Sequence, residues 1–164
     1  MAVFSLSLQI GAMSEVDDAE ANSFVQEFLS QTEDIDGLGI FQNNSLAALP
    51  MFIPGLGIIY GAFTAWSTGF GFAALISMAP GLAEIHPLAI LYSTPYGIME
   101  LIAYSIAMSR SFHIAYVLFK RVNLKSLIKP TVIEIGIVVA ILFAAGVLEE
   151  YMIALAREGT PLFG

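Results

Sequence analysis

The stretch Pro95-Tyr96-Gly97-Ile98-Met99-Glu100 lies inside an apolar run, Leu88 to Met108, and decides how the rest of the chain is interpreted. The run is long enough for a membrane-spanning helix, which needs ~20 apolar residues. A carboxyl group inside such a run is costly unless it faces a protein interior or a wet cavity. On a helix, Tyr96, Glu100 and Tyr104 recur every four residues and share one face. We therefore expect Glu100 to be a neutral acid that is hydrogen-bonded to Tyr96 or Tyr104.

Two interpretations of Glu100 remain open at the level of the sequence. The acid is either a structural group at a seam between helices, or a contact for a proton, an ion or a substrate. Under both interpretations the chain belongs among membrane proteins, because 57% of its residues are hydrophobic and 12% are charged. Soluble domains carry roughly 25% charged residues. The chain has no cysteine, which excludes disulfides and thiol chemistry.

The charged residues are sorted along the chain, which has a formal net charge of -8. Residues 14–44 are rich in Asp and Glu, and no Lys or Arg precedes Arg110. Five of the six basic residues fall between two apolar runs: Arg110, Lys120, Arg121, Lys125 and Lys129. Because short basic loops stay in the cytoplasm, we predict a multi-pass plasma-membrane protein with loop 110–129 cytoplasmic and arm 14–44 extracytoplasmic. We expect no nucleic-acid partner, since backbone binding needs clustered basic side chains.

The first half of the chain divides at changes of hydropathy. Residues 1–13 form a partial N-terminal membrane helix, too short to span alone. In the acidic arm, 14–44, Phe24 and Phe28 lie on the apolar face of an expected amphipathic outer helix, and we predict that they dock a partner protein. Residues 45–65 are the first full span. A turn is expected at 66–69, followed by a short span or re-entrant arm at 70–82.

The second half is expected to contain two more spans. One covers residues 88–108 and is kinked by Pro95. A surface helix is expected within the basic loop, and Pro130 then opens the last span, 131–153, on which Gly136, Ala140 and Ala144 form one small-residue stripe. The fold class is thus all-α, a polytopic transmembrane bundle of about four spans with broken or short helices and an amphipathic outer helix. Residues 45–156 make the membrane domain and 157–164 the C-terminal tail.

Several motifs occur in a recognisable order along the chain. They are Asn43-Asn44 before a span, Gly55 and Gly57 within it, Ser67-Thr68-Gly69 followed by Gly71, Pro95-x-Gly97-x-x-Glu100-Leu101, and Ala144-Ala145 ahead of Glu149. This order, over residues 40–152, resembles the stage II sporulation protein M family of bacterial and archaeal membrane proteins. That family typically shows a Pro-His-Gly-x-x-Glu-Leu motif. Here Tyr96 replaces the histidine, Ser67-Thr68 stands where Asn is usual, and the first helix is largely absent.

The resemblance implies a membrane fold, and the sporulation members of the family look like scaffolds for a septal complex. No Ser-His-Asp arrangement, phosphate loop or closed metal site is recognisable. We therefore expect no catalytic residues, no enzyme activity, no metal and no cofactor. The expected function is a scaffold or accessory subunit that works among membrane lipids and other membrane protein subunits, as a hetero-oligomer. The alternative is a small-solute or ion transporter or channel that uses Glu100 in an oligomer.

Overall fold

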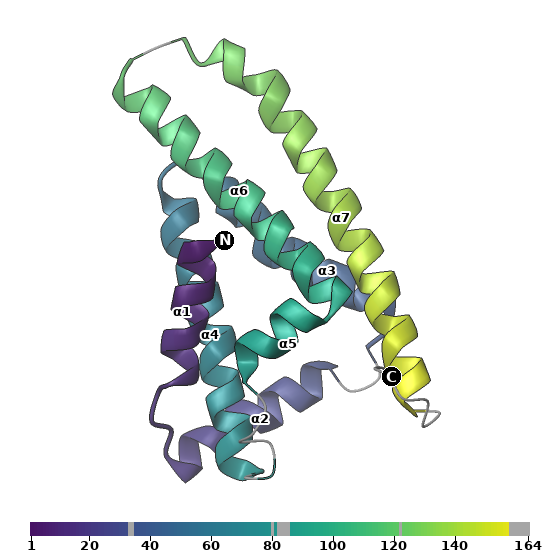
Figure 1. The fold of residues 1–164 in the computed structure, drawn as a ribbon. Coiled ribbons are helices and arrows are strands. Elements are labelled where there is room, and N and C mark those ends of the chain that lie inside the picture. The colour runs from purple at the N-terminus through teal and green to yellow at the C-terminus, as the bar shows by residue number, and fades with distance from the viewer. Residues whose placement is uncertain (33–34, 80, 82–85, 122, 158–164) are drawn as a thin grey trace.

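The structure, a computed structural model, describes residues 1–32, 35–79, 81, 86–121 and 123–157. All regular elements in this part of the chain are helices (Figure 1). In chain order they are α1 (Ala2–Ala12), α2 (Asp18–Thr32), α3 (Gly37–Ala48), the short 3-10 helix η1 (Leu49–Phe52), α4 (Leu56–Met78), α5 (Pro87–Ser93), α6 (Pro95–Phe119) and α7 (Lys125–Arg157). Among the described residues, α4, α6 and α7 are long and apolar enough to cross a membrane. The all-helical membrane bundle is confirmed, with three candidate spans and shorter apolar helices.

The first span begins later than residue 45 and continues further than expected. Gly55, with φ at +76°, turns the chain into α4 in a conformation that side-chain-bearing residues rarely adopt. α4 is then one continuous helix of 23 residues, so the turn expected at 66–69 and the separate span expected at 70–82 are wrong. Within the helix, the hydroxyl of Thr68 donates to the backbone carbonyl of Thr64 (3.0 Å), so its polar group has a partner inside α4. Residues 80 and 82 lie outside the described residues.

The span expected at 88–108 is two helices rather than one kinked helix. Thr94 has extended backbone angles between α5 and α6, and its hydroxyl accepts a hydrogen bond from the N–H of Gly97 (3.2 Å). Pro95 occupies the first position of α6, where its missing N–H has no helical partner to lose. The Thr-Pro pair therefore ends one helix and caps the next.

The basic residues lie at the tip of a helical hairpin. α6 continues to Phe119 and α7 starts at Lys125, so the surface helix expected within residues 110–129 is instead the end of α6 and the first turn of α7 (Figure 1). Pro130 does not open the last span, because it lies inside α7. Near a helix start, a proline removes one backbone hydrogen bond and leaves the following turns intact.

The N-terminal helix α1 lies along α4, side by side with it in Figure 1. Glycines allow the two backbones to touch. A Cβ added at Gly69 would overlap the carbonyl oxygen of Leu8, and one added at Gly11 would overlap that of Trp66. This close approach is the form of packing that small residues permit between membrane helices. The expected short apolar helix at 1–13 is therefore present, and it is anchored on the first span.

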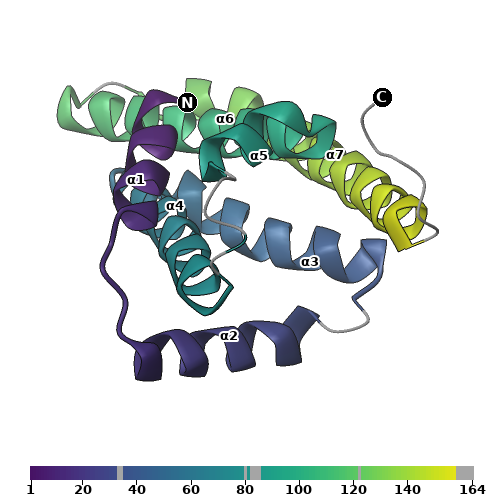
Figure 2. The same cartoon turned by 60° about the horizontal axis from the view of Figure 1, so that its bottom comes forward.

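The acidic helix α2 crosses the far end of α4, opposite to the α6–α7 turn (Figure 1). Ala21 and Val25 are buried against Ala74 of α4. The opposite face of α2 is polar and exposed, so the helix is amphipathic as expected, while its place outside the membrane stays a prediction. Figure 2 shows α3 between α2 and the α6–α7 hairpin, where Phe41 of α3 packs edge-on against Phe143 of α7 at 5.5 Å between ring centroids.

Candidate functional site

Asn44 of α3 links two polar side chains of α6, those of Glu100 and Tyr104. Its side-chain Nδ2 donates to Oε1 of Glu100 (2.6 Å), and the hydroxyl of Tyr104 donates to its Oδ1 (3.0 Å). The expectation that a tyrosine would bond Glu100 directly is therefore wrong. The ring of Tyr104 stacks on Phe4 of α1, with 5.3 Å between the ring centroids. Asn44 can bond both side chains, which lie on another helix, because a side-chain amide both donates and accepts hydrogen bonds.

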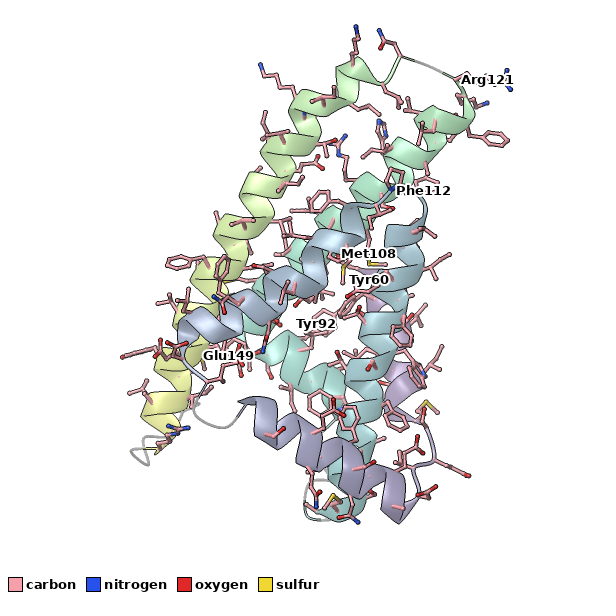
Figure 3. The ribbon with its side chains drawn as sticks, turned by 180° about the vertical axis from the view of Figure 1, so that it is seen from behind. Tyr60, Tyr92, Met108, Phe112, Arg121 and Glu149 are labelled. Carbon is pink, nitrogen blue, oxygen red and sulfur yellow. The ribbon has the colours of Figure 1, made fainter. Side chains whose placement is uncertain are left out.

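A cavity of about 580 Å³ opens beside this network. Residues from α1, α3, α4, α5, α6 and α7 line it, so the site exists only in the folded bundle. Glu149 reaches it where α7 passes α3 (Figure 3). Its polar lining side chains are Asn43, Asn44, Thr68, Thr94, Tyr96, Glu100 and Glu149. The rest of the wall is mainly apolar.

The start of α6 holds Glu100 at the cavity. Gly97 is buried where α6 passes closest to α5. A Cβ on Gly97 would lie 2.6 Å from the carbonyl oxygen of Leu91 and 2.6 Å from Oγ1 of Thr94. A side chain there would push α6 away from α5, and Glu100, one turn later, would shift with it. Pro95 and Gly97 of the predicted motif thus shape the backbone, while Tyr96 and Glu100 face the cavity.

Six of the residues predicted from the sequence come together at this cavity: Asn43, Asn44, Tyr96, Gly97, Glu100 and Glu149. Tyr104 joins them through Asn44. Gly69 does not, because it packs against α1 instead. Sequence reasoning missed Thr94 as the cap of α6, although a threonine directly before a proline is a recognisable helix start.

Helix α2 of the acidic arm, which carries Phe24 and Phe28, lies apart from the Asn44–Glu100 contact. Phe24 packs inside the chain, edge-on to Phe70 at 5.7 Å between ring centroids and against Gly71. The side chain of Phe28 lies outside the described residues. A partner-docking role for these two residues stays a prediction.

A family model, stage II sporulation protein M, matches residues 1–152 of the chain. The chain belongs to this family. The match includes α1 and α2, so it extends well beyond residues 40–152, where the motifs carry the resemblance. No curated protein and no solved structure matches the chain. In this family member, Tyr96, Gly97 and Glu100 of the motif line the open cavity between the helices.

A second polar group in this family member lies nearer the basic turn. Arg110 of α6 pairs with Glu134 of α7: its Nε donates to Oε2 (2.6 Å), and its NH2 group bonds the other carboxylate oxygen. The two charges neutralise each other between the helices, so the pair fixes the register of the hairpin. No group of three or more potential metal ligands gathers in the described part of the chain.

Proposed function

We propose that this sporulation protein M family member is a non-enzymatic scaffold or accessory subunit of a larger membrane protein complex. The family membership supports a membrane role, and the surface of α7 supports assembly. Most of the apolar surface of α7 is left uncovered by the rest of the chain. In a membrane, lipids or the helices of other subunits cover such a surface.

The observation that carries the proposal is the environment of Gly136. A Cβ added at Gly57, Gly61, Gly69 or Gly146 would meet another helix, whereas one added at Gly136 would have nothing within 4 Å. Ala140 and Ala144 continue the same stripe, and all three residues are exposed. Small residues at this spacing let a second helix approach closely. Those four glycines allow close packing between helices of this chain, whereas the Gly136 stripe is free to pack against a helix of a partner.

Replacing Gly136 with leucine tests the proposed stripe. The bulky side chain should keep a partner helix away, so we expect the complex to dissociate while the isolated chain stays folded. Ile137, exposed on α7 but turned away from the stripe, supplies the matched control as Ile137→Leu, which should leave assembly intact. Blue-native electrophoresis of gently solubilised membranes reports the complex, and circular dichroism reports the fold. Unchanged assembly of Gly136→Leu would count against the stripe as a subunit interface.

The same proposal includes an orientation in the plasma membrane. The tip of the α6–α7 hairpin carries Lys120, Arg121 and Lys125, and α2 lies at the opposite end of the molecule (Figure 1). The positive-inside rule then puts the hairpin tip in the cytoplasm and α2 outside.

Single cysteines test this orientation, since the chain has none of its own. We expect Ser23→Cys on α2 to react with an impermeant maleimide in intact cells. Ser126→Cys on α7 should react only after the membrane is opened. Labelling of Ser126→Cys in intact cells, with Ser23→Cys unlabelled, would reverse the orientation.

A transporter or channel is the second candidate function, and the cavity beside Glu100 favours it. Acidic groups inside membrane proteins often lie on ion or substrate paths. Glu100→Gln separates the two functions because glutamine keeps the shape of the acid and can still accept a hydrogen bond from Asn44. A scaffold should assemble and work normally with this change, whereas a proton- or cation-coupled transporter should assemble and lose activity.

A further inference from the structure

We propose that the cavity beside Glu100 binds an amphiphilic organic amine, with its ammonium group at Glu100 and Glu149 and its apolar body along the cavity wall. The proposal is independent of the scaffold role, because a scaffold and a transporter could each hold such a ligand. It rests on three features of the described residues: two carboxyl groups without a basic partner, the apolar lining of the rest of the wall, and the volume of the cavity.

The two carboxyl groups have hydrogen-bonding capacity to spare. Oε1 of Glu100 accepts from Asn44, and no further hydrogen bond from another described residue reaches this carboxyl group. Glu149 makes no hydrogen bond to the described part of the chain. No Lys, Arg or His is among the described residues that line the cavity. Arg110, the basic residue within α6, is already paired with Glu134. A positive charge at this site would therefore come from a ligand.

The chemistry of the lining selects an ammonium group over other polar heads. An ammonium ion donates three hydrogen bonds, and its positive charge favours the ionised form of a carboxyl group that is otherwise neutral in the cavity. Hydrogen bonds to ionised carboxylates are about twice as strong as those between neutral groups. Low polarity around the pair strengthens the attraction further. A carboxylate or phosphate head would instead face two acids, and an alcohol would donate a single hydrogen bond and bring no positive charge to them. Asn44 holds Glu100 in place, so little ordering remains for the ligand to impose.

The remaining wall fits a hydrocarbon body rather than a bare metal ion. Leu8, Phe72, Ile90, Leu91 and Ile153 line it. The volume, about 580 Å³, lies within the roughly 300–1,000 Å³ of sites that hold small organic molecules. A hydrated inorganic cation would leave these apolar side chains against water. An alkyl or aryl amine covers them and brings its charge to the acids.

Photoaffinity labelling tests this assignment on the full chain in lipid nanodiscs. The probe is a primary amine on a twelve-carbon chain with a diazirine near its middle. We expect the label on cavity-lining residues of α5 and α7, and we expect excess dodecylamine to reduce it about tenfold, since one charge-assisted hydrogen bond has that effect. Excess dodecanol should leave the label unchanged. Equal competition by dodecanol would overturn the proposal, as would label spread evenly over the outer faces of α4 and α7.

Three variants complete the experiment. Joint replacement of Glu100 and Glu149 by Gln should reduce labelling about tenfold. Glu150→Gln changes an exposed neighbouring acid that does not line the cavity, so it should label as the unchanged chain does. Ile153→Trp fills the apolar part of the cavity and keeps both acids, so it should also block labelling, which keeps the test decisive if the double variant does not fold. Full labelling of folded Ile153→Trp would show that the amine binds elsewhere.

Discussion

Asn44→Leu is expected to lower the free energy of unfolding by about 3 kcal/mol, because it leaves two buried polar groups without their partner. Glu100 loses the 2.6 Å bond from Nδ2 of Asn44, and the hydroxyl of Tyr104 loses its acceptor. Leucine is close to asparagine in size, so loss of hydrogen bonds rather than loss of volume dominates. The measurement is unfolding in mixed detergent micelles, followed by the fluorescence of Trp66, the single tryptophan.

Asn43→Leu is the matched control for this prediction. Asn43 lines the same cavity but is exposed, and it makes no hydrogen bond to the described part of the chain. We expect its replacement to change stability by less than about 1 kcal/mol, as exposed substitutions usually do. Equal losses for the two asparagines would mean that the Asn44 bridge does not hold the bundle together.

Gly69→Ala is expected to destabilise the fold by about 2 kcal/mol or more, although alanine is the better helix former. The new methyl group would overlap the carbonyl oxygen of Leu8, a backbone atom that cannot rotate away. α1 must then move off α4, and the buried contacts of Phe4 and Leu8 weaken with it. The same unfolding experiment gives the loss.

Gly136→Ala is the matched control: it is the same substitution, but it is not expected to destabilise the fold. Its methyl group meets nothing within 4 Å, so the higher helix propensity of alanine should leave stability unchanged or slightly raised. A Gly69→Ala variant as stable as Gly136→Ala would contradict the close packing of α1 on α4.

The membrane fold could be predicted from the sequence because it depends on local quantities. The lengths of the apolar runs, the prolines and the segregation of charge are visible in any window of the chain. The sequence was misleading where packing between helices, rather than local propensity, decided the structure. Ser67-Thr68-Gly69 is typical of a turn, yet Thr68 bonds back within α4 and Gly69 is needed for contact with α1.

Several residues of the candidate site could be predicted from the sequence, but the hydrogen bonds between them could not. Tyr96 and Glu100 were recognised because an acid within an apolar run is unusual, and Glu149 was recognised through the order of motifs that resembles the family. The partner of Glu100 was missed because Asn44 is 56 residues away in the chain, and helical spacing reveals only neighbours on the same helix. The cavity needs six helices in place, so no single stretch of the sequence could indicate it.

Native mass spectrometry of the chain extracted from its own membrane tests the proposed scaffold role most directly. Extraction in native nanodiscs keeps the lipids and any bound subunits with the chain. The proposal predicts a complex in which this chain and at least one different protein occur at a fixed ratio, lost in Gly136→Leu. A chain found only alone, or only with copies of itself, would contradict the scaffold and leave the transporter as the function to pursue.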